Sequence, residues 1–421
     1  MEVKPGYKQT EVGVIPEDWE VKPLRSCLSA QPDYGINAPA VAYSDRLPTY
    51  IRITDITEDG RFSSEKPVSV KRADTDAYYL NDGDIVFART GASVGKSYLY
   101  EPNDGKLVFA GFLIRVRPDA VKLLPSYLSA CVMTGAYWRW VRLMSMRSGQ
   151  PGINGQEYGQ LPIPVPPLPE QRAIATALSD VDGLLGGLDR LIAKKRDLKQ
   201  AAMQQLLTGQ TRLPGFHGEW EVKTLKEVCW FQEGPGVRNT QFTSSGIKLL
   251  NGTNIFRGVL NLDTTMRFIS ESEGRGAYAH FLADDGDIVL ASSGITIERL
   301  HEKVAFVRPQ DLPFCMNTST IRFKPFKGIL ARAFLFQFLT GDDFKRMIGG
   351  TATGSAQLNF GPFHVEKVEL SVPPLPEQTA IAEVLTDMDA ELAGLTLRRE
   401  KTRALKQAMM QELLTGKTRL V

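Results

Sequence analysis

The sequence has few residues of the kinds that build disulfide frameworks and metal sites. Its four cysteines stand far apart in 421 residues, at Cys27, Cys131, Cys229 and Cys315. None belongs to a Cys-x-x-Cys pair, which argues against a disulfide scaffold and against a zinc ribbon. The four histidines are isolated from one another and from the cysteines, so the spacing of a metal site is also missing.

Long apolar runs and an excess of one charge are absent as well. No segment approaches the roughly 18 uncharged apolar residues of a membrane span, and the first residues lack the apolar core of a signal peptide. We therefore expect a cytoplasmic protein that does not contact a membrane. The 50 basic and 48 acidic residues exclude a polybasic, histone-like binder. They leave open a DNA-binding protein whose charge is arranged locally.

What the sequence does contain is a tandem repeat. The segment Val165-Pro-Pro-Leu-Pro-Glu-Gln171 returns as Val372-Pro-Pro-Leu-Pro-Glu-Gln378, and the match runs without a gap to Leu213 and Leu420. The segments before each copy correspond only at short anchors, which are Trp19-Glu-Val-Lys22, Asp82-Gly-Asp-Ile-Val86 and Ile114-Arg-Val-Arg-Pro118 with their partners in the second half. The chain thus carries two diverged modules, each followed by a nearly constant segment.

Each constant segment has the pattern of one long helix. Pro169 and Pro376 suit a first helical turn, and Gly209 and Gly416 suit a left-handed cap at the end. Apolar residues recur in steps of three and four, which predicts a coiled-coil seam formed by Ile174, Leu178, Val181, Leu185, Leu188 and Ile192 in the first helix and by Ile381, Leu385, Met388, Leu392 and Leu395 in the second. The alternative is that each helix packs only on the core of its own module.

These observations predict an α+β fold with a pseudo-two-fold internal repeat. We expect two globular modules at opposite ends of a long antiparallel two-helix coiled coil. The expected boundaries are residues 1–165 for the first module with its N-terminal segment, 166–210 for the first helix, 211–371 for the second module and 372–421 for the second helix. The linker after the first helix resembles the C-terminal and N-terminal segments joined end to end, so the two termini should lie close together.

Three pairs of polar segments are candidates for a binding surface. The first pair is the glycine-containing loop after each Gly-Asp-Ile-Val strand, where glycine allows close approach and hydroxyl and basic side chains suit phosphates and base edges. The second pair lies just before each long helix and combines Gln and Asn, which can pair with adenine. The third is weaker and comprises Arg52 to Asp55 and Asn251 to Arg257.

Basic residues also alternate with apolar ones in the 114–118 strand, which would neutralise phosphates if its polar face were solvated. The candidate DNA-binding residues are Arg89, Thr90, Ser93, Lys96, Ser97, Arg115, Arg117, Arg147, Gln150, Asn154, Asn251, Asn254, Arg257, Ser292, Ser293, Thr296, Arg299, Thr351, Thr353, Gln357 and Asn359. A hairpin turn and an ordinary solvated surface are the structural alternatives.

Enzyme hypotheses have little support. Gly91-Ala-Ser-Val-Gly-Lys-Ser97 is similar to a phosphate-binding P-loop, but three residues separate its glycines where four are needed. The second module has no lysine at the corresponding place. Glu20-Val-Lys22 and Glu221-Val-Lys223 have the Glu-x-Lys form of nuclease sites, but we interpret both as strand edges.

Taken together, Pro-Pro-Leu-Pro-Glu-Gln opening a long helix, Leu-Leu-Thr-Gly closing it, two copies in one chain and the N-terminal segment from Thr10 to Val21 resemble the specificity subunit of type I restriction–modification systems. The segment from Gly83 to Lys96 is similar to one that recurs in the target recognition domains of that family. The resemblance covers essentially the whole chain. The second module has Ser292 where the first has Arg89, so an arginine contact does not carry over to that position.

The resemblance implies a non-catalytic subunit with two target recognition domains, each recognising one half of a split, asymmetric site in double-stranded DNA. It also implies that two methyltransferase subunits dock on the helices and that restriction subunits join that core. S-adenosylmethionine, ATP and magnesium would then belong to the partner subunits, with no cofactor bound by this chain. The alternative function is a coiled-coil adaptor whose modules bind proteins.

Overall fold

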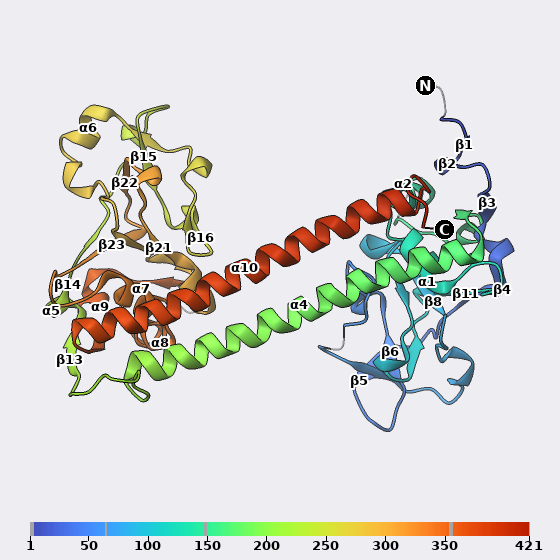
Figure 1. Cartoon of the computed structure of the whole chain (residues 1–421), viewed down its shortest axis with the longest axis horizontal. Helices are drawn as coiled ribbons and strands as arrows, with labels where there is room; N and C mark the ends of the chain where they lie inside the picture. Colours follow the sequence, from blue (N-terminus) through green and yellow to red (C-terminus); the bar gives the residue numbers. More distant parts are fainter. Residues whose placement is uncertain (1–3, 64, 147–149, 353–356, 421) are drawn as a thin grey trace. The chain divides into compact units, whose positions relative to one another are not determined.

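The computed structural model describes residues 4–63, 65–146, 150–352 and 357–420, and within them the chain forms two compact units. The first unit comprises residues 1–189 and 398–421, and the second comprises residues 190–397. Each unit contains one globular module together with part of each of two long helices, α4 (Leu168–Thr208) and α10 (Leu375–Leu413) (Figure 1). The unit boundaries therefore cut across the two helices that the sequence predicts.

The ends of the long helices follow the predicted signals closely. Both helices begin one residue before the expected proline, at Leu168 and Leu375. Gly209 follows α4 directly with a left-handed φ of 73°, and Gly416 adopts a φ of 66° three residues after the end of α10. A left-handed residue without a Cβ ends a helix at little steric cost, which explains why glycine stands at both places.

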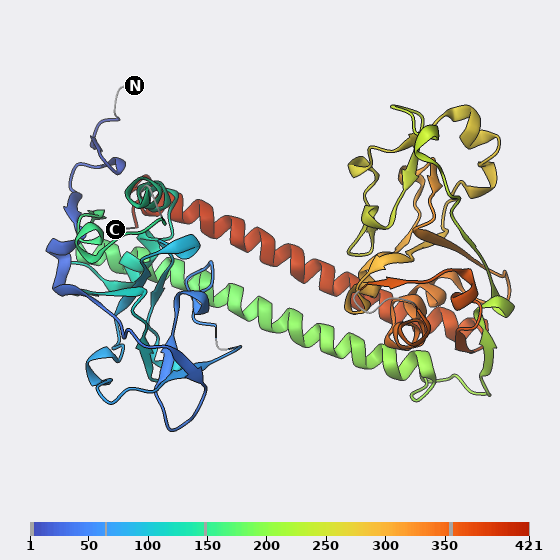
Figure 2. The ribbon, with the colours of Figure 1, turned by 180° about the vertical axis from the view of Figure 1, so that it is seen from behind.

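Within each unit the two helices run antiparallel and side by side (Figures 1 and 2). In the first unit Lys406 binds Asp182 at 2.7 Å and Arg399 binds Asp189 at 3.3 Å. The second unit repeats the first of these pairs, because Lys199 binds Asp389 at 2.6 Å. Lys199 and Lys406 thus each form an ion pair with the neighbouring helix.

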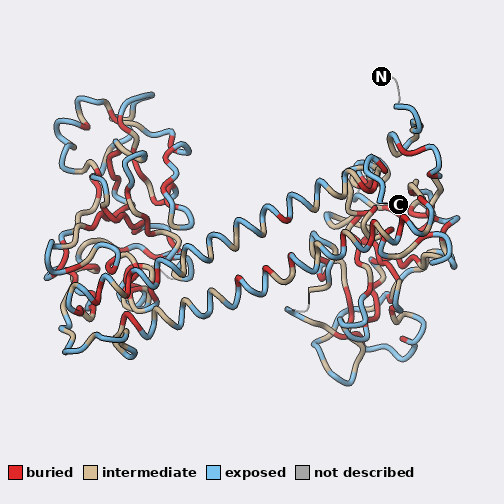
Figure 3. The backbone as a smooth tube through the Cα atoms, in the orientation of Figure 1, coloured by how far each residue is buried: buried red, intermediate tan, exposed pale blue. Residues whose placement is uncertain are grey.

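The predicted seam residues are largely inside. Buried positions on the two helices are Ile174, Leu178, Leu185, Leu188, Ile192, Ile381 and Leu385, and half-buried ones are Val181, Met388, Leu392 and Leu395. Burial alternates with exposure along both helices (Figure 3). The first turns also enter the core of their own module, since Ile174 and Leu178 pack in the first module and Ile381 and Leu385 in the second. Both packing hypotheses therefore hold, for different parts of each helix.

The first module contains two four-stranded sheets. One is fully antiparallel, with the strand order β4 (Leu28–Tyr34), β11 (Leu113–Pro118), β8 (Ile85–Ala88) and β9 (Ser97–Leu99). The other has the order β10 (Leu107–Phe109), β6 (Thr49–Ile51), β7 (Val68–Val70) and β5 (Ala40–Ala42), with β10 and β6 parallel. Strand β12 (Pro162–Val165) pairs with β3 (Glu20–Pro23), and β1 (Tyr7–Thr10) with β2 (Gly13–Pro16). The helices are α1 (Pro125–Cys131), α2 (Gly135–Ser145) and α3 (Gly155–Tyr158).

The second module repeats this plan. Its antiparallel sheet has the same order, β14 (Cys229–Glu233), β23 (Thr320–Pro325), β19 (Ile288–Ala291) and β21 (Val304–Phe306). A smaller sheet contains β18 (Phe268–Ile269), β15 (Ile247–Leu250) and β22 (Phe314–Met316), again with a parallel pair, β15 and β22. Strand β13 (Glu221–Thr224) pairs with β25 (Glu369–Val372), β16 (Ile255–Phe256) with β17 (Val259–Leu260), and β20 (Ser293–Ile295) with β24 (Leu358–Asn359). The helices are α5 (Leu225–Val228), α6 (Glu271–Arg275), α7 (Arg332–Thr340), α8 (Asp342–Thr351) and α9 (Pro362–Val365).

The first turn of each long helix contains a buried glutamate that accepts hydrogen bonds from an arginine and a tryptophan. In the second unit Arg212 donates two hydrogen bonds to Glu377, and the Trp220 indole donates a third at 3.1 Å. In the first unit Glu170 receives the same contacts from Arg419 and from Trp19 at 2.9 Å. A single linker supplies both partners of Glu377, whereas the partners of Glu170 come from the two ends of the chain.

The termini of the described chain consequently meet in the first unit. The Tyr7 hydroxyl donates to the carbonyl of Gly416 at 2.9 Å, and Arg419 also binds Asp18. All four cysteines are buried and free. Within the described residues, no helix combines the length and apolar character needed to cross a membrane.

Candidate nucleic-acid interface

The loop after β8 and the segment before α3, two of the candidate segments, lie against each other in the first module. Thr90 bridges Gly152, the Gly91 amide donates to Pro151 O at 3.0 Å, and the Ile153 amide donates to Arg89 O at 2.9 Å. The loop is also the connection of a β8–β9 hairpin, with left-handed Gly91 (φ 72°) and Gly95 (φ 90°). The turn alternative is therefore correct as a description of the backbone.

The second module joins the corresponding segments in the same way. Strand β20 follows β19 and pairs with β24, so that Ser293 faces Asn359, and the Phe360 amide donates to Ser292 O at 3.0 Å. Equivalent backbone contacts identify equivalent residues in the two modules. On this basis Arg89 corresponds to Ser292, Thr90 to Ser293 and Gly152 to Asn359.

In the first module this surface carries an arginine stacked on a tyrosine. The Arg89 guanidinium lies 5.1 Å from the centre of the Tyr34 ring, and the Tyr34 hydroxyl accepts a hydrogen bond from the Gly155 amide at 3.0 Å. Phe112 lies beside them with 56% of its surface exposed, and its carbonyl accepts from the Arg89 amide. Stacking on an anchored ring holds the guanidinium in place, which favours its use as a planar donor to a base edge or phosphate.

The surface of the second module is polar and less basic at the same place. Ser293, Thr296, Arg299, Gln357 and Asn359 are exposed. The Ser293 hydroxyl donates to the Asn359 side chain at 2.6 Å, and Arg299 binds Glu302 at 2.8 Å. Thr351 is exposed at the end of α8. In the first module, Thr90 and Ser93 are half-buried in the loop and Gln150 is exposed.

The third pair of candidate segments forms one-turn helices in equivalent positions. Asp55 accepts from the Arg52 amide and binds its guanidinium at 2.8 Å, and Asn254 accepts from the Asn251 amide at 2.9 Å. The segment adjoins the candidate loop, because a Cβ on Gly252 would lie 3.0 Å from the Ala291 side chain at the end of β19. Next to it, Arg257 stands at the tip of the β16–β17 hairpin with a φ of 50° and its guanidinium 5.1 Å from the Phe256 ring.

A lysine that the sequence comparison missed belongs to this surface. Ser97 pairs with Phe87 in the first module, and Val304 pairs with Leu290 in the second, so the residues just before them, Lys96 and Lys303, are equivalent. The Lys303 ammonium donates to the carbonyls of Gly252 and Ile255 at 3.0 and 2.7 Å. Lys96 donates to Ile56 O at 3.5 Å and binds Glu58 at 2.7 Å. The second module therefore keeps the lysine, contrary to the sequence-based expectation.

Burial lowers the pKa of Lys303, which is half-enclosed by these carbonyls. Both lysines tie the one-turn helix to the strand that follows the candidate loop. The loop between the paired strands is longer in the second module, so counting residues along the loop does not match the two lysines. The pairing of β21 with β19 is the signal that identifies Lys303.

Four candidate DNA-binding residues are corrected because their side chains are inside the protein. Ser97, Arg115, Asn254 and Ser292 are at most 5% exposed. Ser97 is part of β9, Asn254 caps its one-turn helix, and Ser292 is buried directly after the end of β19. Burial leaves these side chains no surface for a DNA contact.

Arg115 is the clearest correction, since its buried guanidinium is held by two carboxylates and two carbonyls. It binds Asp33 at 2.6 Å and Asp84 at 3.4 Å and donates to the carbonyls of Tyr79 and Ala77. Arg117 is half-buried and also binds Asp33, at 3.0 Å. Of the two arginines on the strand from Leu113 to Pro118, only Arg117 is therefore partly open to solvent.

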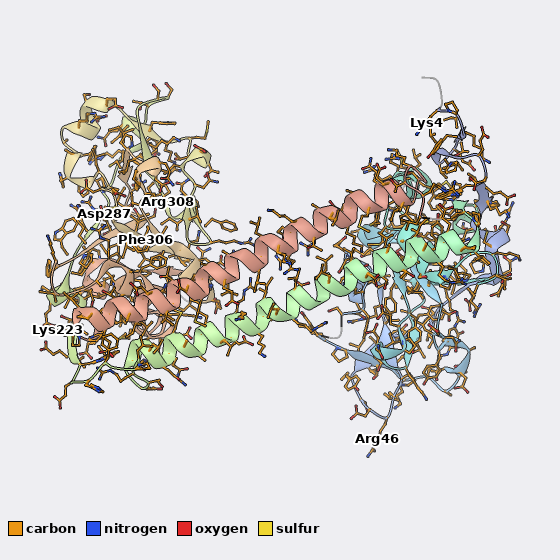
Figure 4. All side chains as sticks on the ribbon, viewed as in Figure 1. Lys4, Arg46, Lys223, Asp287, Phe306 and Arg308 are labelled. Carbon is orange, nitrogen blue, oxygen red and sulfur yellow. The ribbon has the colours of Figure 1, made fainter. Side chains whose placement is uncertain are left out.

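The second module repeats the buried pair with Arg322 and Asp287, 3.3 Å apart. Asp287, labelled in Figure 4, precedes Ile288, which pairs with Phe306 on the neighbouring strand. Burial raises the pKa of both the Asp84 and Asp287 carboxyls, while the adjacent guanidinium acts in the opposite direction. The Asp-Gly-Asp-Ile-Val and Ile-Arg anchors of the repeat thus supply the two partners of a structural ion pair.

Of the three candidates that remain, one caps a helix and two lie outside the residues that the structure describes. Asn154 accepts from the Glu157 amide at 2.9 Å and caps the short helix α3, while its side chain is half-buried. Arg147 and Thr353 lie outside the described residues. Among the residues that the structure describes, no group of three or more His, Cys, Asp or Glu side chains could hold a metal ion.

Comparison with known proteins assigns a family to this arrangement. The chain matches one family model twice, over residues 16–192 and 217–402, and that family is described as the type I restriction modification DNA specificity domain. A putative type I restriction enzyme MjaX specificity subunit of Methanocaldococcus jannaschii is 26% identical, over 98% of this chain and 97% of the relative. The type I restriction enzyme MjaVIII specificity subunit of the same organism is 25% identical, over 96% and 94%.

Solved structures show the same fold at lower sequence identity. A chain from a study of complex assembly and conformational transition of the type I R-M system aligns with a TM-score of 0.58 at 17% identity, over 96% of this chain and 99% of the other. The type-I restriction-modification system S subunit from M. genitalium aligns with a TM-score of 0.57 at 15% identity, over 98% of both chains. These alignments cover both modules and both helices.

Proposed function

Since the chain belongs to the type I restriction modification DNA specificity family, we propose that it recognises a bipartite, asymmetric DNA site with one module for each half-site. It is a DNA-recognition subunit, and the chemistry of methylation and cleavage belongs to other subunits. The observation that carries the proposal is the pair of equivalent surfaces. The same backbone positions carry Arg89, Tyr34 and Phe112 in one module and a buried Ser292, Glu233 and Ser319 in the other. The two surfaces therefore differ in chemistry, as two different half-sites require.

The partners follow from the family membership. We propose that two methyltransferase subunits bind the helical regions, that restriction subunits join this core, and that S-adenosylmethionine, ATP and magnesium are bound by these partners. The complex would act in the cytoplasm. In each module we expect the DNA contacts at the loop after β8 or β19 together with the segment before α3 or α9, which pair with each other. Their basic and amide side chains suit phosphates and base edges.

Exchange of modules within the chain tests independent recognition. Residues 28–158, from β4 to α3, would be replaced by residues 229–365, from β14 to α9, which keeps the Trp19–Glu170–Arg419 contacts intact. The complex with its methyltransferase subunits is then used to select binding sites from random DNA. We expect a site in which the second half-site is unchanged and the first has become a second copy of it.

The reverse exchange is the matched control and should duplicate the first half-site instead. If either exchange altered both half-sites, the modules would not recognise DNA independently. If the unmodified complex selected no DNA sequence at all, the proposed function would be wrong and the protein-binding adaptor would be the better hypothesis.

A further inference from the structure

One exposed side chain occupies the same place in both modules. Gln150 and Gln357 each stand three residues before the amide that donates to the end of the β8 or β19 strand, from Ile153 to Arg89 O and from Phe360 to Ser292 O. Each is exposed. The equivalence rests on these hydrogen bonds, because the residues preceding the two glutamines differ in sequence.

Each glutamine also lies against a left-handed glycine of the loop. A Cβ on Gly91 would lie 3.2 Å from Gln150 Nε2, and one on Gly294 would lie 3.9 Å from Gln357 Oε1. The two glycines have φ values of 72° and 70°, a conformation that other residues rarely adopt. In both modules the carboxamide thus lies at the face of the glycine where a side chain would otherwise stand.

The positions around the glutamines have diverged. Arg89 corresponds to Ser292, Phe112 to Ser319, Gly152 to Asn359 and Asn154 to Gly361, as the shared backbone contacts show. Two modules that recognise different half-sites would be expected to differ there. A polar, exposed side chain that does not differ suggests a contact that the two half-sites have in common.

We propose that Gln150 and Gln357 make this shared base contact and that their partner is adenine, at equivalent positions of the two half-sites. The proposal rests on the function proposed above. A carboxamide offers one donor and one acceptor, and adenine presents a matching acceptor and donor, N7 and the N6 amino group, in the major groove. Guanine presents two acceptors there, so a glutamine would leave one of its groups unpaired.

The test uses the full chain in complex with its methyltransferase subunits and random double-stranded DNA. Gln150→Ala should weaken binding to the preferred site about 10- to 100-fold and remove discrimination at one adenine of the first half-site. Gln357→Ala should do the same at the corresponding adenine of the second half-site. Because a carboxylate accepts from the cytosine amino group, Gln150→Glu should shift the preference at that position towards cytosine.

Gln160 is the matched control, since it is an exposed glutamine of the same module that follows α3. Gln160→Ala should leave affinity and preference unchanged, and thermal unfolding of all variants should match the unmodified chain. Equal loss of affinity for every sequence would indicate a phosphate contact, and unchanged discrimination would indicate packing against the loop. Either result, or relaxation at a base other than adenine, overturns the inference while leaving the proposed function intact. Failure of the unmodified complex to select a site would overturn both.

Discussion

At the end of β8 the first module holds Arg89 on the ring of Tyr34, whereas at the same backbone position after β19 the second module buries Ser292. The buried side chains show the opposite behaviour. Arg115 and Asp84 in one module correspond to Arg322 and Asp287 in the other, and both pairs connect the same two strands of the four-stranded sheet. The two halves of the chain have kept this buried ion pair and changed the side chain at the end of the neighbouring strand.

This difference separates two roles that basic residues can have in such a protein. An arginine on a strand of the sheet is structural when carboxylates enclose it, and each module should lose stability when its own buried arginine is removed. An arginine on the loop after the strand is available to a ligand, and its loss should affect one module only. The predictions below test this separation, beginning with the largest expected effect.

Removal of the buried guanidinium should strongly destabilise either module. Arg115→Met leaves Asp84 buried without its partner, which costs about 3–5 kcal/mol of unfolding free energy. Arg322→Met should cost somewhat less, because the Arg322 Nε has no partner among the described residues, whereas the Arg115 Nε donates to Asp33. Denaturant unfolding of the full chain measures both losses.

The control is Arg117→Met, which removes a half-exposed partner of Asp33 and should cost at most about 1 kcal/mol. The effect of Arg115→Met should also depend on pH. Burial raises the pKa of the Asp84 carboxyl in the folded state, and loss of the guanidinium raises it further, so protonation relieves the unpaired charge. The destabilisation should therefore be smallest at acidic pH and grow as the pH rises. A change in DNA sequence preference without a loss of stability would contradict the structural role.

Arg89→Ala should affect DNA recognition and not folding. We expect specific binding to weaken by about 1–3 kcal/mol at fixed salt, with relaxed preference at one position of the first half-site. The counterpart Ser292→Ala should leave DNA binding unchanged, because the Ser292 hydroxyl is buried and, among the described residues, has no hydrogen-bond partner. Binding isotherms of both variants with matched and single-mismatch DNA give the comparison. Unchanged affinity of Arg89→Ala would show that the loop is only a hairpin turn.

The sequence was sufficient to predict the duplication, the two long helices and the antiparallel pairing seen within each unit, because these depend on local signals and on a period of three and four residues. The loop and the pre-helix segment that it singled out pair with each other in both modules, and their contact with DNA stays a prediction. The sequence was misleading at Arg115, since alternation of basic and apolar residues looks the same whether water or another layer of protein covers the polar face. The carboxylates that enclose Arg115, at Asp33 and Asp84, lie far away in the sequence and become its neighbours only through strand pairing.

The equivalence of Lys96 and Lys303 was missed for a related reason. Alignment of the loops by their glycines places Lys96 opposite a different residue, and only the pairing of β21 with β19 shows that Lys303 is its equivalent. The arrangement of the two modules relative to each other, at opposite ends of the coiled coil, stays a prediction from the antiparallel repeat.

The smallest expected effects concern these two lysines, which distinguish a purely structural tie from one that also faces DNA. Lys303→Met removes hydrogen bonds to two carbonyls and should destabilise the second unit by about 1–2 kcal/mol, with no change in the salt dependence of DNA binding. Lys96→Met should cost less stability, at most about 1 kcal/mol, because its ion-pair partner Glu58 is 83% exposed. If the Lys96 ammonium also meets a phosphate, its removal should reduce the slope of log affinity against log salt by about 1 and leave base preference unchanged. Salt titrations of both variants, alongside their unfolding curves, decide the matter: equal slopes would assign Lys96 the same structural role as Lys303.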